Sequence, residues 1–405
     1  MPGCLKHVKK LVKIGIALAL AGAIGLAAFL GYLAVERKMP RSLPVPTGPY
    51  AVGRMAYDWV DTSRIDPLAP QPGVKRELLV WVWYPAAPGP NAAPAPYVPV
   101  AWSQAHNRDQ GVGIFVENDL SSIQTHAFEN APLASAAAAF PVLIMQPGMG
   151  PVPTDYTIMA ETLASQGYVV AGINQTYTSN LVVFPDGRVV PRSGAGTIPD
   201  SATPTEVDQD MIRIGAVWQA DARFVADQLQ QLNADPASPL HNHLDMAHLG
   251  FFGHSFGGAT AIAVCQQDAR CQAGVDMDGT PSSVEQAASV PKPFMLMTED
   301  YTRGCDSDCA AMRQVYDHTL QGAAYFVSVA GTRHFNFSDL PYRQLAIPRL
   351  LFIAAGYEGT IDPARGLQIA DAYLLAFFDR YLKGAASPLL AGPSATYPES
   401  TFMHR

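Results

Sequence analysis

The longest apolar run lies close to the start of the chain. Ile14 to Val35 contains no charged residue over 22 positions, and Lys6, Lys9, Lys10 and Lys13 precede it. Such a run can cross a bilayer, and its positive flank stays on the cytoplasmic side. The run exceeds the apolar core of a typical signal peptide. The pattern therefore favours an uncleaved anchor with an exported body over a cleaved signal peptide or a buried core helix.

Beyond Gly73, short apolar runs alternate with longer stretches whose apolar residues recur at helical spacing. This alternation predicts an α/β fold in which a mostly parallel central sheet carries helices on both faces. The expected strands are Glu77 to Tyr84, Pro141 to Met145, Tyr168 to Ile173, His248 to Gly253, Ala273 to Met277, Pro293 to Met297 and Ala324 to Val329. The expected helices are Asp155 to Ser165, Glu206 to Leu232, Gly257 to Gln267, Cys309 to Leu320 and Arg365 to Leu382.

Proline and glycine divide the chain into segments. We expect an anchor over residues 1–38, a linker with little regular structure over 39–72, one α/β domain over 73–385 and a tail over 386–405. Residues 86–139 hold an insertion rich in Ala and Pro, which is expected as a lid, a substrate wall or a plain surface loop.

Composition narrows the class of protein. The chain has 405 residues, of which 48% are hydrophobic and 15% charged, as in ordinary folded proteins. The net charge is -8, and no cluster of Lys and Arg occurs outside the first forty residues. Nucleic acid is therefore a poor candidate partner, because phosphate binding depends on clustered basic residues.

The cysteines fit an exported body. Cys4 precedes the apolar run, and the other four follow it: Cys265, Cys271, Cys305 and Cys309. An even set suggests two disulfides, and the short spacings favour Cys265 with Cys271 and Cys305 with Cys309 among three possible pairings. A zinc site is less favoured because the usual CxxC spacing is missing.

A candidate nucleophile stands between an expected strand and an expected helix. The segment Gly253-His254-Ser255-Phe256-Gly257-Gly258 follows an apolar strand and opens onto helix-forming residues. A serine on such a sharp turn, flanked by glycines two positions away, is the nucleophile elbow of the α/β-hydrolase fold. The helix N-terminus also favours developing negative charge. The context therefore predicts Ser255 as a catalytic nucleophile.

A serine nucleophile needs a histidine base, which follows it in the chain order of this fold. Three histidines follow Ser255: His318, His334 and His404. His318 lies within a helical pattern, and His404 is the penultimate residue. His334 comes after the last expected parallel strand and a short loop, where the base belongs. We therefore expect His334 to be the base.

The acid that orients this base has three candidates at strand ends. Asp276 and Asp278 lie at the end of one strand, and Asp300 follows the next one. Asp278 is closer to the carboxyl end of its strand, where ligands bind in such sheets. Asp300 occupies the commoner acid position of the fold. Spacing alone leaves the choice open.

Four segments together resemble the platelet-activating-factor acetylhydrolase family, in its plasma and intracellular type II branch: Gly253 to Thr260, Arg270-Cys271, Gly274 to Asp278 and Gly331 to Phe337. The resemblance runs from about Trp83-Tyr84-Pro85 to His334 and beyond. It implies ester substrates and places the acid at Asp278, with Asp300 as the fallback. The family in turn resembles bacterial cutinase-like polyesterases, whose acid would correspond to Asp300.

The oxyanion formed during acyl transfer needs two backbone N–H groups. Phe256, directly after the nucleophile, supplies one, and Met149 in the loop after an earlier strand is the expected second donor. The family usually has a His-Gly pair where this chain has Pro147-Gly148. That departure leaves the shape of the oxyanion hole open.

Two further groups of residues carry weaker signals. His241, His243 and His248 lie near one another in the sequence, but no acidic pattern completes a metal site, so no metal is expected. The aromatic residues Trp102, Phe335 and Phe337 either line an acyl pocket or belong to the core.

The sequence thus predicts an exported or membrane-anchored serine esterase that acts through Ser255, His334 and Asp278. No cofactor is expected, and the expected partners are a small ester or lipid substrate and, through the N-terminal helix, a membrane. Short-chain or phospholipid-type esters are the implied substrates. The alternatives are a cutinase-like polyesterase or lipase, and a hydrolase-fold binding module without catalysis. The oligomeric state stays open.

Overall fold

The computed structural model of the chain describes residues 2–135, 139–281, 288–302 and 304–405. A large mixed sheet forms the body, with its strands in the order β1-β5-β2-β3-β7-β6-β10-β11-β12-β13-β14, and β4 pairs with β5. The strands of this sheet are β1 (Arg41–Ser42), β2 (Ala51–Ile65), β3 (Lys75–Ala86), β4 (Pro94–Pro96), β5 (Ile123–Glu129), β6 (Phe140–Gln146), β7 (Val169–Asn174), β10 (Leu244–His254), β11 (Cys271–Met277), β12 (Phe294–Thr298), β13 (Ala324–Val329) and β14 (Ser400–His404). A separate hairpin joins β8 (Leu181–Val183) to β9 (Val189–Pro191).

The centre of the sheet is parallel. Strands β7, β6, β10, β11, β12 and β13 pair in parallel with their neighbours, whereas β3 and β14 join antiparallel. All seven strands expected from the apolar runs are present, and the prediction of a mostly parallel sheet is confirmed. Because these strands run the same way, the loops at their carboxyl ends gather at one edge of the sheet.

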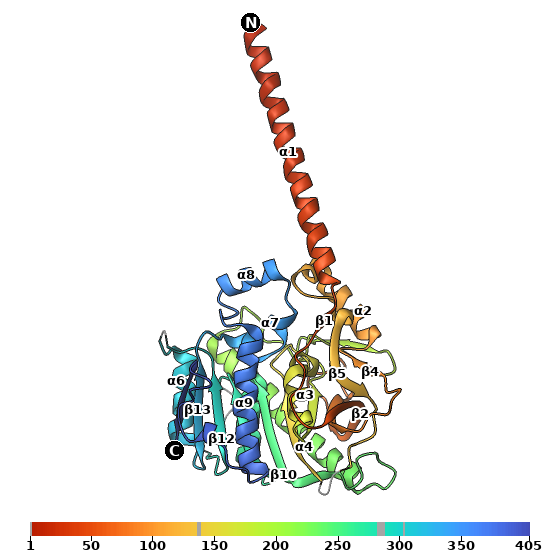
Figure 1. Cartoon of the computed structure of the whole chain (residues 1–405), viewed down its shortest axis with the longest axis vertical. Coiled ribbons are helices and arrows are strands. Elements are labelled where there is room, and N and C mark those ends of the chain that lie inside the picture. Colours follow the sequence, from red (N-terminus) through yellow and green to blue (C-terminus); the bar gives the residue numbers. More distant parts are fainter. Residues whose placement is uncertain (1, 136–138, 282–287, 303) are drawn as a thin grey trace.

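Helices cover both faces of the sheet (Figure 1). The helices are α1 (Pro2–Arg37), α2 (Val100–Gln110), α3 (Thr157–Ser165), α4 (Pro204–Ala234), α5 (Phe256–Gln267), α6 (Ser307–Gln314), α7 (Leu340–Arg343), α8 (Ala346–Ala354) and α9 (Pro363–Leu382). The buried side chains of α3 and α9 belong to one apolar cluster, and many of those of α4, α5 and α6 to a second. A third, smaller cluster joins the first half of α4 to Phe256 at the start of α5. The five expected helices are therefore present, although a π-helical turn follows α6.

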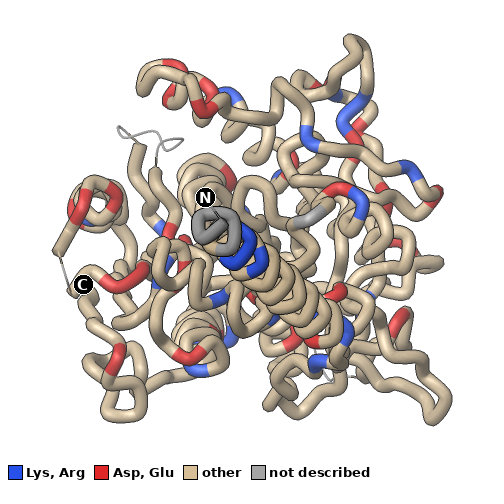
Figure 2. The backbone as a smooth tube through the Cα atoms, turned by 90° about the horizontal axis from the view of Figure 1, so that it is seen from above, with Lys and Arg blue, Asp and Glu red and all other residues tan. Residues whose placement is uncertain are grey.

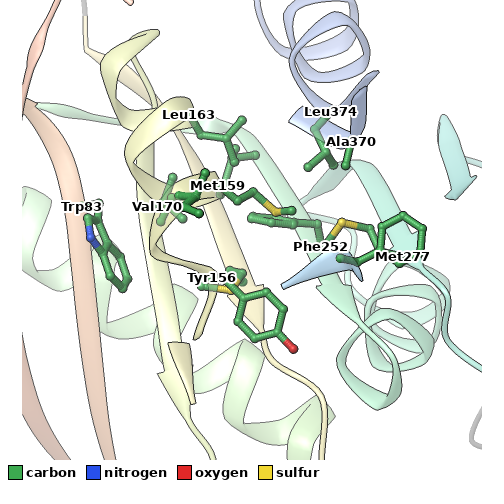
Figure 3. Close-up of a cluster of buried hydrophobic side chains, with 14 of the residues drawn as sticks. Trp83, Tyr156, Met159, Leu163, Val170, Phe252, Met277, Ala370 and Leu374 are labelled. Carbon is green, nitrogen blue, oxygen red and sulfur yellow. The ribbon is translucent and has the colours of Figure 1, made fainter. Parts of the chain in front are cut away.

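Figure 3 shows part of the cluster beneath α3 and α9. Met159 and Leu163 of α3 and Leu374 of α9 meet Phe252 of β10, and these side chains are at most 1% exposed. Burial of large apolar side chains at this density contributes about 1.5–3 kcal/mol for each side chain. The cluster therefore fixes β10, the strand that leads to Ser255, against both helices.

The sheet extends beyond the expected domain boundaries. Residues 39–72 were expected to form an irregular linker, but β2 lies in this segment and pairs antiparallel with β3 from Ala51 to Ile65. Side chains of β2 alternate between buried or half-buried and exposed positions over much of the strand, so it lacks the continuous apolar run of a central strand. The expected tail over 386–405 likewise contains β14, which pairs antiparallel with β13.

The insertion at residues 86–139 is structured where the chain is described, and residues 136–138 lie outside the described residues. It contains β4, α2 and β5, and β5 joins the sheet beside β2. Trp102 of α2 is 2% exposed, and its ring meets Trp81 edge-on with ring centroids 5.7 Å apart. The insertion therefore packs against the sheet as an integral layer of the body.

Helix α1 protrudes from one end of the body (Figure 1). The stretch Lys9–Arg37 is long and apolar enough to cross a membrane, and its most apolar window is unburied. Its last turn is docked, because Arg37 is 7% exposed and forms an ion pair with Asp119 at 2.9 Å. Figure 2 looks along this helix and shows its lysines near the N-terminus, whereas charges of both signs are interspersed over the body. The anchor-like helix thus joins the body without a flexible stalk.

Both expected disulfides are present. Cys265 at the end of α5 is bonded to Cys271 at the start of β11, and Cys305 is bonded to Cys309 of α6. Structural disulfides persist in oxidising compartments. Together with the exposed apolar helix, they indicate that the body lies outside the cytoplasm.

Candidate active site

Ser255 occupies a strained turn between β10 and α5. Its backbone has φ 56° and ψ -126°, a conformation that residues other than glycine rarely adopt. The backbone passes close to its neighbours here, since a Cβ atom on Gly257 would lie 2.1 Å from the carbonyl oxygen of Gln146. The backbone N–H of Ser255 donates to the carbonyl of Met277 at 2.8 Å, which ties the turn to β11. Glycine at position 257 is therefore a steric requirement of this turn.

His334 follows β13 and faces the serine. Its Nε2 lies 2.9 Å from Oγ of Ser255, and its Nδ1 lies 2.7 Å from Oδ2 of Asp278. Burial by itself would lower the pKa of His334, but the hydrogen bond and the charge of Asp278 outweigh it and raise the pKa above its ordinary value. The imidazole therefore lies between a hydroxyl and a carboxylate, and its basicity is increased.

Asp278 lies directly after β11 with φ 58°. Its Oδ1 accepts a hydrogen bond from the backbone N–H of Glu299 at 2.9 Å, which fixes the carboxylate with Oδ2 toward the base. Glu299 in turn forms an ion pair with Arg333 at 2.8 Å. The structure thus brings Ser255, His334 and Asp278 into one chain of hydrogen bonds.

The two other candidate acids hold different positions. Asp300 accepts hydrogen bonds from the backbone N–H groups of Thr302 and Gly331, so its carboxylate shapes the loop that leads to His334. Asp276 is fully buried under the turn and accepts from the N–H of Gly279. Burial raises the pKa of Asp276 well above its ordinary value, and the neighbouring Asp278 adds to this effect. Neither residue is hydrogen-bonded to His334 in the described contacts.

The loop after β6 approaches the serine. A Cβ atom on Gly148 would lie 3.3 Å from Cβ of Ser255, so Pro147 to Gly150 forms one wall of the site. Met149 follows Gly148 in this loop, and Phe256 is the first residue of α5. The two residues expected as oxyanion donors thus lie next in the chain to Gly148 and to Ser255, on the two segments where this fold class provides such donors.

A second histidine packs against the base, and no sequence pattern predicted a role for it. His254 is 1% exposed, and its ring centroid lies 4.5 Å from that of His334. Its Nε2 donates to the carbonyl of His334 at 2.8 Å, and its Nδ1 lies 2.8 Å from the hydroxyl of Tyr156. That hydroxyl also accepts from the N–H of Gly148 at 3.0 Å. The only sequence signal was its position next to Ser255.

A cavity of about 330 Å³ adjoins the loop after β6, whereas Ser255 and His334 line a separate cavity of about 340 Å³ together with Asp278 and Glu299. Met149, Phe335 and Trp102 line the first cavity, so the insertion contributes one of its walls, and its role as a substrate wall stays a prediction. Phe337 does not line this cavity, because its side chain is 1% exposed and packs with His254 at a ring-centroid distance of 6.2 Å. Two of the three expected aromatic residues thus face the cavity, and the third belongs to the core.

His241, His243 and His248, at and just before the start of β10, lie apart from this site. Nδ1 of His248 contacts Asp245 at 2.7 Å, and Nδ1 of His241 donates to the backbone carbonyl of Asn233 at 3.1 Å. Within residues 2–135, 139–281, 288–302 and 304–405, no group of three or more His, Cys, Asp and Glu side chains is arranged as a metal site.

The fold and the strained serine turn define the chain as an α/β hydrolase. A family model described as "Platelet-activating factor acetylhydrolase, isoform II" matches residues 41–184 and 225–386. The chain belongs to this family and is therefore a carboxylic ester hydrolase.

Individual relatives agree with this family. A "Probable 1-alkyl-2-acetylglycerophosphocholine esterase" from Arthroderma benhamiae is 25% identical over 402 residues, which cover 91% of this chain and 96% of the relative. The "Platelet-activating factor acetylhydrolase" of Cavia porcellus is 22% identical, over 64% of this chain and 62% of the relative. Among solved structures, a ferulic acid esterase from Streptomyces cinnamoneus matches with a TM-score of 0.74 and 31% identity, over 90% of this chain and 99% of that one.

Proposed function

We propose that the chain is a serine esterase in which Ser255 is the nucleophile, His334 the general base and Asp278 the residue that orients the base. The observation that carries this proposal is the continuous chain of hydrogen bonds from Oγ of Ser255 through His334 to Asp278, at 2.9 and 2.7 Å. These distances are within reach for proton transfer. Asp300 does not compete for the acid role, because its carboxylate oxygens accept from Thr302 and Gly331.

The steps follow from this geometry. Oγ of Ser255 attacks the ester carbonyl while Nε2 of His334 takes its proton, and the oxyanion forms toward the N–H groups of Met149 and Phe256. The intermediate then expels the alcohol, which receives the proton from His334 and leaves an acyl-serine. A water molecule, deprotonated by His334, attacks the acyl group, and the imidazolium then returns this proton to Oγ of Ser255 as the acid is released. Asp278 stabilises the imidazolium in both halves of the cycle.

The substrates that we propose are esters of short acyl groups, including phospholipid-type esters. Their support is the family and the fungal relative named as an esterase of an acetylated glycerophosphocholine. The cavity beside Met149 and Phe335 is of moderate size, which suits a short acyl or alkyl group.

A second candidate follows from the structural neighbour, which is a ferulic acid esterase. Aromatic residues Trp102, Phe335 and Phe352 line the cavity, and they could stack on a hydroxycinnamoyl group. Cutinase-like polyester or triglyceride hydrolysis is the other alternative within the same chemistry. A binding module without catalysis is less supported, because the hydrogen-bonded serine and histidine would then have no use.

We propose further that α1 anchors the enzyme in a membrane and that the body faces this membrane with α8. Ile347, Leu350 and Leu351 of α8 are exposed. The helix lies at the same end of the body as α1 (Figure 1), and the N–H of Ala346 donates to Glu36 of α1 at 2.8 Å. Exposed leucines beside a bilayer-spanning helix would bury their apolar surface in the interface.

The test of the esterase proposal uses the full chain in detergent micelles. Hydrolysis of p-nitrophenyl acetate, p-nitrophenyl butyrate and methyl ferulate is measured for the wild type and for Ser255→Ala, together with labelling by a fluorophosphonate probe. The variant is expected to lose turnover by several orders of magnitude and to lose the label. Turnover and labelling that persist in a folded Ser255→Ala variant would disprove the assignment of the nucleophile.

A further inference from the structure

Two arginines, Arg343 and Arg192, line the cavity beside the oxyanion loop. They differ in whether carboxylates compensate their charge. Arg343 forms ion pairs with Glu117 at 3.0 Å and with Asp155. Glu117 also contacts His106, so the acidic groups of this wall are all paired. Arg192 has no carboxylate within ion-pair distance among the described residues; the hydrogen bond of its guanidinium there runs from Nη2 to the amide oxygen of Asn180 at 2.7 Å. The positive charge of Arg192 is therefore left uncompensated.

Arg192 lies directly over the oxyanion loop. It follows β9 of the β8–β9 hairpin, and a Cβ atom on Gly150 would lie 2.4 Å from its Nη2. The same hairpin is tied to the loop by a hydrogen bond from the N–H of Asn180 to the carbonyl of Gly150 at 2.7 Å. A side chain at position 150 would therefore displace the guanidinium from this place. Arg192 is thus held one residue away from Met149, the proposed oxyanion donor.

Two donors on residues that line this cavity have neither a hydrogen-bond partner nor an ion-pair partner in the described structure. Nε of Arg192 and Oγ1 of Thr154 are both buried without a hydrogen bond, and both residues line the cavity. A buried polar group without a partner costs about 1–3 kcal/mol, so native proteins rarely leave two of them in one cavity without a use. Burial also lowers the pKa of Arg192, which means that its charge is partly desolvated. A bound anion would satisfy both donors and compensate the charge.

We propose that Arg192, assisted by Thr154, binds an anionic oxygen group, a carboxylate or a phosphate, that is part of the ester substrate. The inference rests on the proposed esterase function and narrows its substrate class to esters that carry an anionic group close to the scissile carbonyl. The apolar part of such a substrate meets Leu181, Phe335 and Phe352, which line the same cavity. The enzyme would then prefer an anionic amphiphile over a neutral ester of the same length.

Two pairs of esters test this preference and locate the anion. In the first pair the acyl group differs: the p-nitrophenyl half-ester of glutaric acid is compared with p-nitrophenyl pentanoate. In the second pair the alcohol differs: an acetylated alkylglycerol phosphate is compared with the acetylated alkylglycerol that lacks the phosphate. Loss of one charge-assisted hydrogen bond in Arg192→Gln is expected to lower kcat/KM for the anionic member of one pair about 10- to 100-fold, with little change for its neutral partner. Arg192→Lys should keep part of the preference because it keeps the charge.

Arg188→Gln is the matched control, because Arg188 lies on the same hairpin but is exposed and paired with Glu77 and Asp186. It should leave both members of each pair unchanged. A selective loss in the first or second pair supports the proposal and assigns the anion to the acyl or the alcohol side. Equal losses for charged and neutral esters would mean that Arg192 only supports the loop, and no loss in either pair would mean that it binds no substrate anion; both results overturn the proposal. Failure of the wild type to hydrolyse even the neutral esters would instead reject the esterase function.

Discussion

The hydroxyl of Tyr156 lies 2.8 Å from Nδ1 of His254, the residue directly before the proposed nucleophile. Because the carbonyl of His334 can only accept, Nε2 of His254 carries the hydrogen and Nδ1 accepts from Tyr156. Burial lowers the pKa of His254 well below its ordinary value, which keeps the ring neutral. Figure 3 shows the Tyr156 ring within the apolar cluster and its hydroxyl directed away from it. The pair joins the oxyanion loop, through Gly148, to the backbone of the base.

We expect Tyr156→Phe to lower both stability and kcat. The change removes the donor to His254 and the acceptor for Gly148, so the free energy of unfolding should fall by about 1–3 kcal/mol. Displacement of the loop and of His334 should lower kcat more than it raises KM, because the affected groups act on the transition state. Urea unfolding and steady-state kinetics measure the two effects. Wild-type values for both would show that the contact does not position the site.

Replacement of the two candidate acids, Asp278 and Asp300, should affect kcat to very different extents. Asp278→Asn should lower kcat by about three to four orders of magnitude, because the amide favours the wrong tautomer of His334 and no longer stabilises the imidazolium. Asp300→Asn should have a much smaller effect, since its carboxylate accepts from the backbone of its own loop. Circular dichroism and thermal unfolding serve as controls for folding. The assignment would be reversed if Asp300→Asn were the more damaging change.

The pH dependence of kcat/KM should show a limb that belongs to His334. The base must be neutral to accept the serine proton, so activity is lost as the pH falls through its pKa, and Asp278 raises this pKa above its ordinary value. In Asp278→Asn the charge that favours the imidazolium is gone, and the remaining activity should show this limb at lower pH. Profiles of p-nitrophenyl butyrate hydrolysis measure the shift. An unshifted limb in the variant would mean that another group titrates.

The bond between Cys265 and Cys271 should stabilise the fold around the serine turn. It joins the end of α5 to the start of β11, the two elements that follow Ser255 and lead to Asp278. Chain-entropy arguments give about 2 kcal/mol for a loop of this size. We therefore expect the double variant Cys265→Ala/Cys271→Ala to unfold at lower urea concentration than the wild type without reductant. Equal stability of the two proteins would contradict this expectation.

The exposed face of α8 should matter only for substrates presented by lipid. Replacing Leu350 and Leu351 with Gln removes apolar surface beside the anchor without touching the hydrogen-bonded site. Hydrolysis of an ester embedded in vesicles should fall several-fold, while hydrolysis of soluble p-nitrophenyl acetate stays unchanged. A parallel loss with both substrates would instead indicate that α8 shapes the cavity, since the neighbouring Phe352 lines it.

The local pattern of the sequence determined much of this protein. Seven apolar runs gave the strands around the parallel centre of the sheet, because a buried strand must be apolar on both faces. The serine turn was predicted from the glycines around Ser255 and from their place between a strand and a helix. A side chain at these glycine positions would clash with neighbouring backbone atoms. Spacings of four and six residues likewise favoured the two disulfides that the structure shows, because short loops bring their ends together.

Only the tertiary structure decided what depends on contacts between distant segments. Strand β2 lacks a continuous apolar run, because its side chains alternate in exposure over much of its length. Irregular segments can show the same pattern, so only the structure revealed its pairing with β3. Asp278 and Asp300 both stand after apolar strands, and only the direction of their carboxylates distinguishes them. Arg192 carries no motif at all. Its charge is uncompensated because the acidic groups of the cavity wall are paired with Arg343. Its guanidinium lies over Gly150, which is distant from it in the sequence, so local spacing could not predict this arrangement.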